Sequence, residues 1–150
     1  MKWRIALVAA ALLALCAFVA FVLNTPPALL DARDLDALTI YAYRDWQSTG
    51  MMVSPDHRFQ IRARGQWLYT PGEWHGPSGH ARFLSPAFYP LPGVRGGALI
   101  GKIGDNGRPF YVGAQYTGGG SESGMLYLRI DDDILSDNEG QLQVDIQILN

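Results

Sequence analysis

The chain has almost no cysteine and no excess of positive charge. Its one cysteine, Cys16, lies in an apolar segment near the N-terminus, so a disulfide within the chain is excluded. The 12 Lys and Arg residues are outnumbered by 14 Asp and Glu residues. A nucleic-acid-binding domain needs a basic surface that neutralises phosphates, and this balance does not supply one. The composition therefore excludes a disulfide scaffold and argues against a nucleic-acid partner.

Charge is also missing from residues 5–23, IALVAAALLALCAFVAFVL. These 19 residues are long enough to cross a hydrocarbon core of about 30 Å as a helix. Lys2 and Arg4 precede them, which predicts that the N-terminus stays inside and that the rest lies outside. A cleaved signal peptide also starts with basic residues, but its apolar part is typically about 7 to 15 residues long. The sequence thus favours a signal-anchor or transmembrane helix over residues 1–24, inserted in the inner membrane through residues 5–23. Secretion after signal cleavage is the alternative.

Helical spacing gives way to short alternating runs further along the chain. Residues 25–38 contain Pro26 and Pro27 followed by spaced leucines, which predicts a stalk or a short helix. Residues 141–149, QLQVDIQIL, alternate apolar and polar side chains, as does a strand with one buried face. Runs of this kind predict an all-β domain over residues 39–150, a small β-sandwich in the periplasm or outside the cell. Residues 70–96 interrupt the pattern as a long loop rich in glycine and proline.

No set of catalytic residues is recognisable in the sequence. No serine lies in a G-x-S-x-G motif. His75 and His80, in WHGPSGH, could offer two imidazoles to zinc, but no cysteine or third histidine lies at a usual ligand spacing. The pattern favours surface histidines without a metal, and a protein that is not an enzyme.

Acidic residues are concentrated in residues 129–141, RIDDDILSDNEGQ, between two predicted strands. Calcium takes about six to eight oxygen ligands, which carboxylates, amides and main-chain carbonyls of one loop can supply. An EF-hand is excluded, because this loop lacks the glycine at position six and the glutamate at position twelve. Two interpretations remain, a solvated acidic loop and a calcium site at the end of a β-sandwich.

Four segments of the chain resemble one family. They are GGALIGKIGDNG (96–107), GMLYLRIDDDILSDNEGQLQVDIQI (124–148), SPDHRFQIRARGQW (54–67) and WHGPSG (74–79). Together they resemble the bacterial calcium-dependent galactophilic lectins of the PA-I type. The resemblance covers about residues 50–148 and implies a β-sandwich of the jelly-roll or galactose-binding-like kind.

The resemblance also implies a calcium ion and its ligands. Side-chain oxygens would come from Asp131, Asp137 and Asn138. Main-chain carbonyls would come from Val53 and Ile134, and sugar hydroxyls would complete the coordination. His80 follows GPSG and is the candidate sugar contact, although its spacing departs from the family pattern.

Two functional hypotheses follow from these observations. The first is a membrane-anchored, extracytoplasmic, calcium-dependent module that binds a galactose-type carbohydrate. The second is a lectin-like envelope domain that contacts another envelope protein or has a structural role, with no sugar binding.

Overall fold

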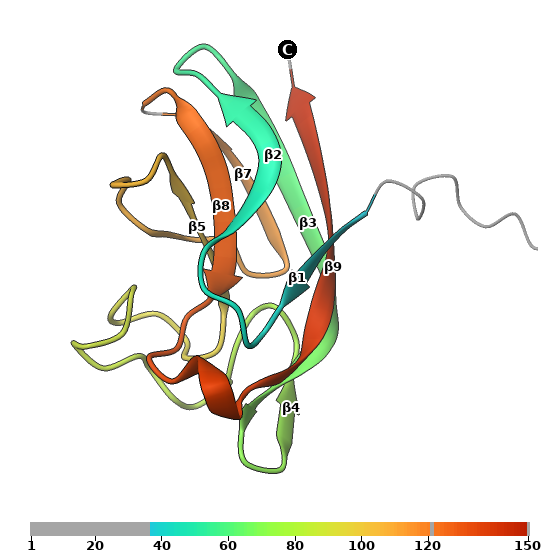
Figure 1. The fold of residues 1–150 in the computed structure, drawn as a ribbon, viewed down its shortest axis with the longest axis vertical. Helices are drawn as coiled ribbons and strands as arrows, with labels where there is room; N and C mark the ends of the chain where they lie inside the picture. Colours follow the sequence, from blue (N-terminus) through green and yellow to red (C-terminus); the bar gives the residue numbers. More distant parts are fainter. Residues whose placement is uncertain (1–36, 121, 150) are drawn as a thin grey trace, which may run out of the picture. The chain divides into compact units, whose positions relative to one another are not determined.

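The structure, a computed structural model, describes residues 37–120 and 122–149. These residues form an all-β domain of two antiparallel sheets, as the sequence predicts (Figure 1). The predicted membrane helix over residues 1–24, and the predicted stalk as far as residue 36, lie outside the described residues. Within the described ranges, no helix is long and apolar enough to cross a membrane.

The first sheet is built around one long strand, β3 (Arg58–Thr70). Strand β9 (Glu139–Leu149) pairs with β3 along most of its length, and β1 (Leu38–Tyr41) lies on the far side of β9. Strand β7 (Gln115–Gly119) pairs with the first residues of β3, and β4 (Glu73–His75) pairs with its last residues. The end of β3 therefore reaches the same end of the domain as the start of β9.

The second sheet contains four strands in the order β2-β8-β5-β6. They are β2 (Gln47–Val53), β8 (Gly124–Ile130), β5 (Leu99–Ile103) and β6 (Phe110–Tyr111). The buried side chains of both sheets pack into one hydrophobic core, which includes Phe59 and Ile61 of β3 and Leu126 and Leu128 of β8. Alternation explains this arrangement, because successive strand residues face opposite sides of a sheet.

Two connections meet at one end of the sandwich. The acidic turn, residues 131–138, leaves β8 in the second sheet, forms the short 3-10 helix η2 (Leu135–Asp137) and enters β9 in the first sheet. The long loop, residues 76–98, joins β4 to β5 and lies beside the acidic turn (Figure 1). Gly97 N donates a hydrogen bond to Asp131 O at 2.9 Å, and Trp67 Nε1 donates to Gly97 O at 2.9 Å. These bonds fix the end of the long loop against both sheets.

Candidate functional site: an acidic pocket

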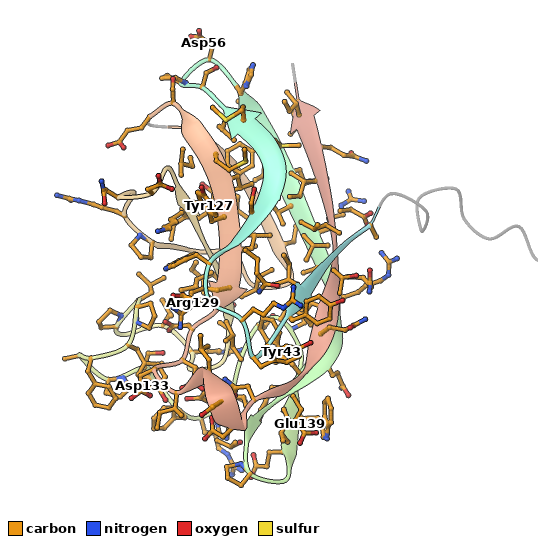
Figure 2. The ribbon with its side chains drawn as sticks, viewed as in Figure 1. Tyr43, Asp56, Tyr127, Arg129, Asp133 and Glu139 are labelled. Carbon is orange, nitrogen blue, oxygen red and sulfur yellow. The ribbon has the colours of Figure 1, made fainter. Side chains whose placement is uncertain are left out.

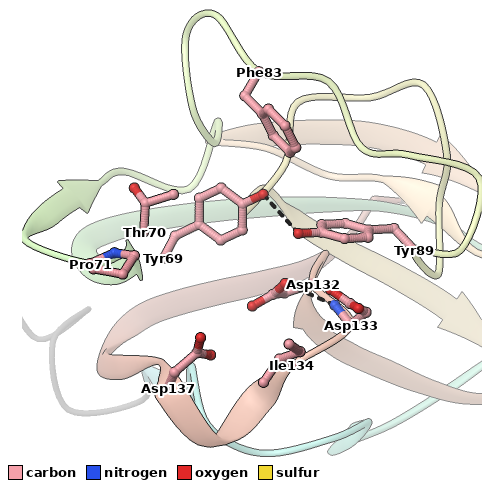
Figure 3. Close-up of a pocket in the computed structure, with 9 residues that line it drawn as sticks. All are labelled: Tyr69, Thr70, Pro71, Phe83, Tyr89, Asp132, Asp133, Ile134 and Asp137. Atoms are coloured by element: carbon pink, nitrogen blue, oxygen red, sulfur yellow. Dashed lines mark hydrogen bonds between the residues drawn. The ribbon is translucent and has the colours of Figure 1, made fainter.

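A pocket of about 210 Å³ opens where the acidic turn meets the end of β3 and the long loop (Figure 3). We call it the acidic pocket. Its lining residues are Tyr69, Thr70, Pro71, Phe83, Tyr89, Asp132, Asp133, Ile134 and Asp137. One side is thus carboxylate-rich and the other side is aromatic.

Asp132 supplies the buried carboxylate of the pocket. Its side chain accepts hydrogen bonds from Asn138 Nδ2 at 2.7 Å and from Asp133 N at 2.8 Å. Only 4% of Asp132 is exposed, and this burial raises the pKa of its carboxyl group above the ordinary value. Hydrogen bonds from Asn138, from Tyr89 and from the main chain of Asp133 and Ile134 oppose this rise, and a bound cation would likewise favour the ionised carboxylate.

Asn138 has a buried amide oxygen that lacks a partner. Its Nδ2 donates to Asp132 Oδ2 and, at 3.1 Å, to Ile134 O, so the nitrogen faces two acceptors and the amide orientation is determined. The Oδ1 atom finds no hydrogen-bond donor among residues 37–120 and 122–149. A buried polar atom left unpaired costs about 1–3 kcal/mol, and a cation bound beside it would remove that cost.

Asp137 is the second carboxylate of the pocket, and it is exposed. It lies at the last position of η2, directly before Asn138. Figure 3 shows Asp132 and Asp137 on the acidic-turn side of the pocket, together with Ile134. Two residues that the sequence predicts as ligands, Ile134 and Asp137, thus line the pocket together with Asp132. The third, Asn138, is outside the lining and is joined to Asp132 and Ile134 by hydrogen bonds.

Two tyrosines form the wall opposite the carboxylates. The hydroxyl groups of Tyr69 and Tyr89 are hydrogen-bonded at 3.1 Å, and the Phe83 ring lies 6.4 Å from the Tyr69 ring. Burial raises the pKa of both tyrosines, so both hydroxyls stay protonated at neutral pH. Tyr89 is also hydrogen-bonded to Asp132, so both hydroxyls are engaged within the protein and the wall offers mainly ring surface to a ligand.

Asp131, a predicted calcium ligand, does not line the pocket. Its carboxylate is fully buried and accepts hydrogen bonds from Ser85 Oγ at 2.5 Å and Leu91 N at 2.9 Å. Both donors belong to the long loop, so Asp131 holds that loop against the end of β8. Asp132, the next residue, lines the pocket instead, whereas Asp131 holds the long loop.

Val53, the predicted carbonyl ligand, lies at the other end of the sandwich. It is the last residue of β2 and pairs with Gly124 at the start of β8. Asp131 lies seven residues further along (131 minus 124), or roughly 20 Å at about 3.3 Å per strand residue. Figure 2 shows Asp56, in the turn just after β2, and Asp133 at opposite ends of the domain. Val53 cannot share an ion with the acidic turn, and the segment that reaches the turn from β3 is Tyr69–Pro71.

His80, the candidate sugar contact, lies beside the pocket and outside its lining. Its ring contacts that of Phe83, which lines the pocket, with 6.3 Å between the ring centroids. Nothing in the sequence indicates Tyr69 and Thr70 as pocket residues, because no local pattern shows that the end of β3 meets the acidic turn.

One solved structure places this fold among known proteins. The chain is similar to the EclA N-terminal domain, described as a PllA-like lectin, with a TM-score of 0.60 and 19% sequence identity. The match covers 75% of this chain and 95% of that domain. No protein-family model matches the chain, and no curated protein matches its sequence. At this identity the likeness shows the fold, and the described residues form a lectin-like β-sandwich.

Proposed function

We propose that the domain binds carbohydrate through a calcium ion held in the acidic pocket. The observation that carries this proposal is the buried, unpaired Oδ1 of Asn138, which lies next to Asp137 in the chain and is bonded through its own amide to Asp132. A solvated acidic loop would not explain a buried oxygen without a donor. The lectin-like fold and the resemblance to calcium-dependent galactophilic lectins support the same function.

The proposed ligands come from two segments. Asp132, Asp137 and Asn138 supply side-chain oxygens, and Ile134 and the Tyr69–Thr70 segment supply main-chain carbonyls. Calcium takes about six to eight oxygens, so this set leaves room for hydroxyl groups of a ligand. Asp132 replaces Asp131 in the set, because the Asp131 oxygens are already bonded to the long loop.

The pocket size and its aromatic wall support a small sugar ligand. A volume of about 210 Å³ lies below the roughly 300–1,000 Å³ of pockets for drug-sized ligands, so a single terminal sugar ring is the ligand that fits best. Tyr69, Tyr89 and Phe83 offer ring faces to the apolar face of the sugar. We propose a galactose-type sugar on the strength of the family resemblance.

Calorimetry tests the proposal directly. Titration of the chain with a panel of galactosides and other monosaccharides should give binding heat in calcium and none in chelator. Asp132→Asn should abolish the heat, whereas Glu139→Gln, an exposed acid outside the pocket lining, should leave it unchanged. Absence of heat for every sugar in both conditions would refute carbohydrate binding.

A second candidate function is contact with an envelope protein. Leu84 and Phe88 of the long loop are 62% and 69% exposed, and Trp74 of β4 is 51% exposed. Exposed apolar side chains grouped near one end of a domain favour a protein contact. A pull-down from membranes in the presence of excess sugar tests this function. A protein partner that the wild-type chain recovers and Phe88→Ser does not would support this function in place of the first.

We further propose that residues 1–24 anchor the domain to the inner membrane and place it outside the cytoplasm. The apolar run of residues 5–23 after Lys2 and Arg4 supports this proposal. Fractionation of cells that produce the full chain should find it in the membrane, and replacing Ala10, Leu15 and Val19 by lysine should release it. A shortened mature chain in the soluble fraction would support signal cleavage.

A further inference from the structure

A second group of metal-ligating side chains lies next to the acidic pocket. It consists of Glu73, His75 and His80, whose ligand atoms all lie within 4.8 Å of one another. Glu73 Oε2 is 3.5 Å from His75 Nε2 and 3.4 Å from His80 Nε2. None of the three residues is needed for the calcium site proposed above.

The fold explains why three residues separated in the sequence converge. Glu73 and His75 are two positions apart on β4, so their side chains lie on one face of the strand. A turn closed by the bond from Gly79 N to Gly76 O then reverses the chain, and His80 N donates to Gly96 O at 2.8 Å. This turn brings the His80 ring to 4.7 Å from the His75 ring.

We propose that Glu73, His75 and His80 bind a divalent transition-metal ion, with Zn²⁺ as the reference ion. Zinc binds histidine nitrogen and carboxylate oxygen at about 2.0–2.2 Å in tetrahedral geometry, which places ligand atoms about 3.3–3.5 Å apart. The two distances from Glu73 Oε2 agree with this separation. Two imidazoles and one carboxylate form a three-ligand site with a fourth position open to water.

The position of Glu73 favours a ligand shared by both histidines over an ion pair with one of them, because its Oε2 lies at nearly equal distances, 3.5 and 3.4 Å, from the two ring nitrogens. A neutral ring nitrogen is the form that a metal requires. The Glu73 side chain is 61% exposed, yet it is turned toward both rings.

Metal binding changes two existing hydrogen bonds. Arg82 N donates to His80 Nδ1 at 3.1 Å, and this bond is lost when Nε2 binds the metal and Nδ1 carries the proton. Thr70 Oγ1 lies 3.1 Å from His75 Nε2, and the metal takes its place there. Arg82 is exposed and Thr70 is partly exposed, so water replaces both partners at little net cost.

The site would tie β4 to the start of the long loop and so support the aromatic wall of the acidic pocket. The His75 ring packs edge-on against Tyr69 at 5.9 Å, and the His80 ring packs against Phe83 at 6.3 Å. Tyr69 and Phe83 both line the pocket. An ion on the two histidines therefore limits the movement of the rings that we propose contact the sugar.

Thermal unfolding of the full chain with and without zinc tests this site. Zinc at about 100 times its dissociation constant should raise the wild-type midpoint by roughly 10 °C, since binding to the native state stabilises it by mass action. His80→Gln and His75→Gln should lose the shift, and the exposed variant Glu73→Gln should weaken zinc binding at least about tenfold. Co²⁺ in place of zinc should give the visible absorption of a tetrahedral site, and His80→Gln should lose it.

Two controls separate this site from others on the chain. His57→Gln should keep the zinc response, because His57 lies in the turn between β2 and β3. Asp132→Asn should keep the zinc response while it loses the calcium response, so the two proposals can fail independently. A wild-type midpoint that zinc does not move, or a shift that persists in His80→Gln, would overturn the proposal.

Discussion

Asp131 and Asp132 are neighbours with the same side chain and different roles. Asp131 binds the long loop through Ser85 and Leu91, whereas Asp132 faces the pocket. We expect Asp131→Asn to lower the free energy of unfolding by about 1–3 kcal/mol, because its new amide group faces donors, and to leave calcium affinity nearly unchanged. Asp132→Asn should abolish calcium binding, and it should also lower the free energy of unfolding, because the Asp132 carboxylate accepts hydrogen bonds too. Urea unfolding with and without calcium distinguishes the two, and equal effects of both variants on calcium affinity would contradict the assignment.

The same two residues predict how the stability of the calcium-free protein depends on pH. Burial raises the pKa of both carboxyl groups above 3.8, so the folded state holds these protons more tightly than the unfolded state. In chelator, their contribution to stability should therefore fall as the pH rises from about 4 through the folded pKa values. Calcium binds the ionised carboxylates, so the rise in midpoint that it causes should be larger at about pH 7 than at about pH 4.5. An equal rise at both pH values would contradict this prediction.

The second-to-last residue of strand β8 is an arginine that holds the acidic turn in place. The guanidinium of Arg129 donates to Asp132 O at 2.6 Å and to Ile130 O at 2.9 Å, and it pairs with Asp45. Arg129→Met should lower the free energy of unfolding by about 2–4 kcal/mol, because it leaves these acceptors without their charged donor. It should also weaken calcium binding through the displaced turn. The exposed Arg108 offers a matched control, for which we expect a change within about 0.5 kcal/mol in chemical unfolding.

Whole strands were predicted well where alternation was regular and poorly where it was not. Apolar and polar side chains alternate in residues 58–64 and 141–149, and both segments lie in strands. The regular alternation stops at Gly65, but this glycine lies inside the strand with a φ of +107°, and β3 continues to Thr70. Pairing with β9, which is distant in sequence, fixes this extension and brings Tyr69 to the pocket. The local pattern could show neither this extension of β3 nor the three-residue strand β4, which lies among glycines and prolines.

The whole domain depends on packing between its two sheets, because no disulfide is available to it. Leu128 is fully buried in the shared core. Leu128→Ala should lower the free energy of unfolding by about 2–5 kcal/mol, a larger loss than any pocket substitution should cause. Sugar binding should remain detectable at temperatures below the unfolding midpoint of this variant. Leu149, 36% exposed at the end of β9, is the matched control, and its alanine variant should unfold close to the wild type.

The acidic turn is one of the connections that cross from one sheet to the other, since β8 and β9 belong to different sheets. An ion bound to both this turn and the end of β3 would hold the two sheets together at this end of the sandwich. Amide hydrogen exchange reports such opening, because a local separation of the sheets exposes strand ends to solvent. Calcium should slow exchange at the C-terminal end of β8 and the N-terminal end of β9, and leave the opposite strand ends unchanged. The ligand site would then also set how often the two sheets separate.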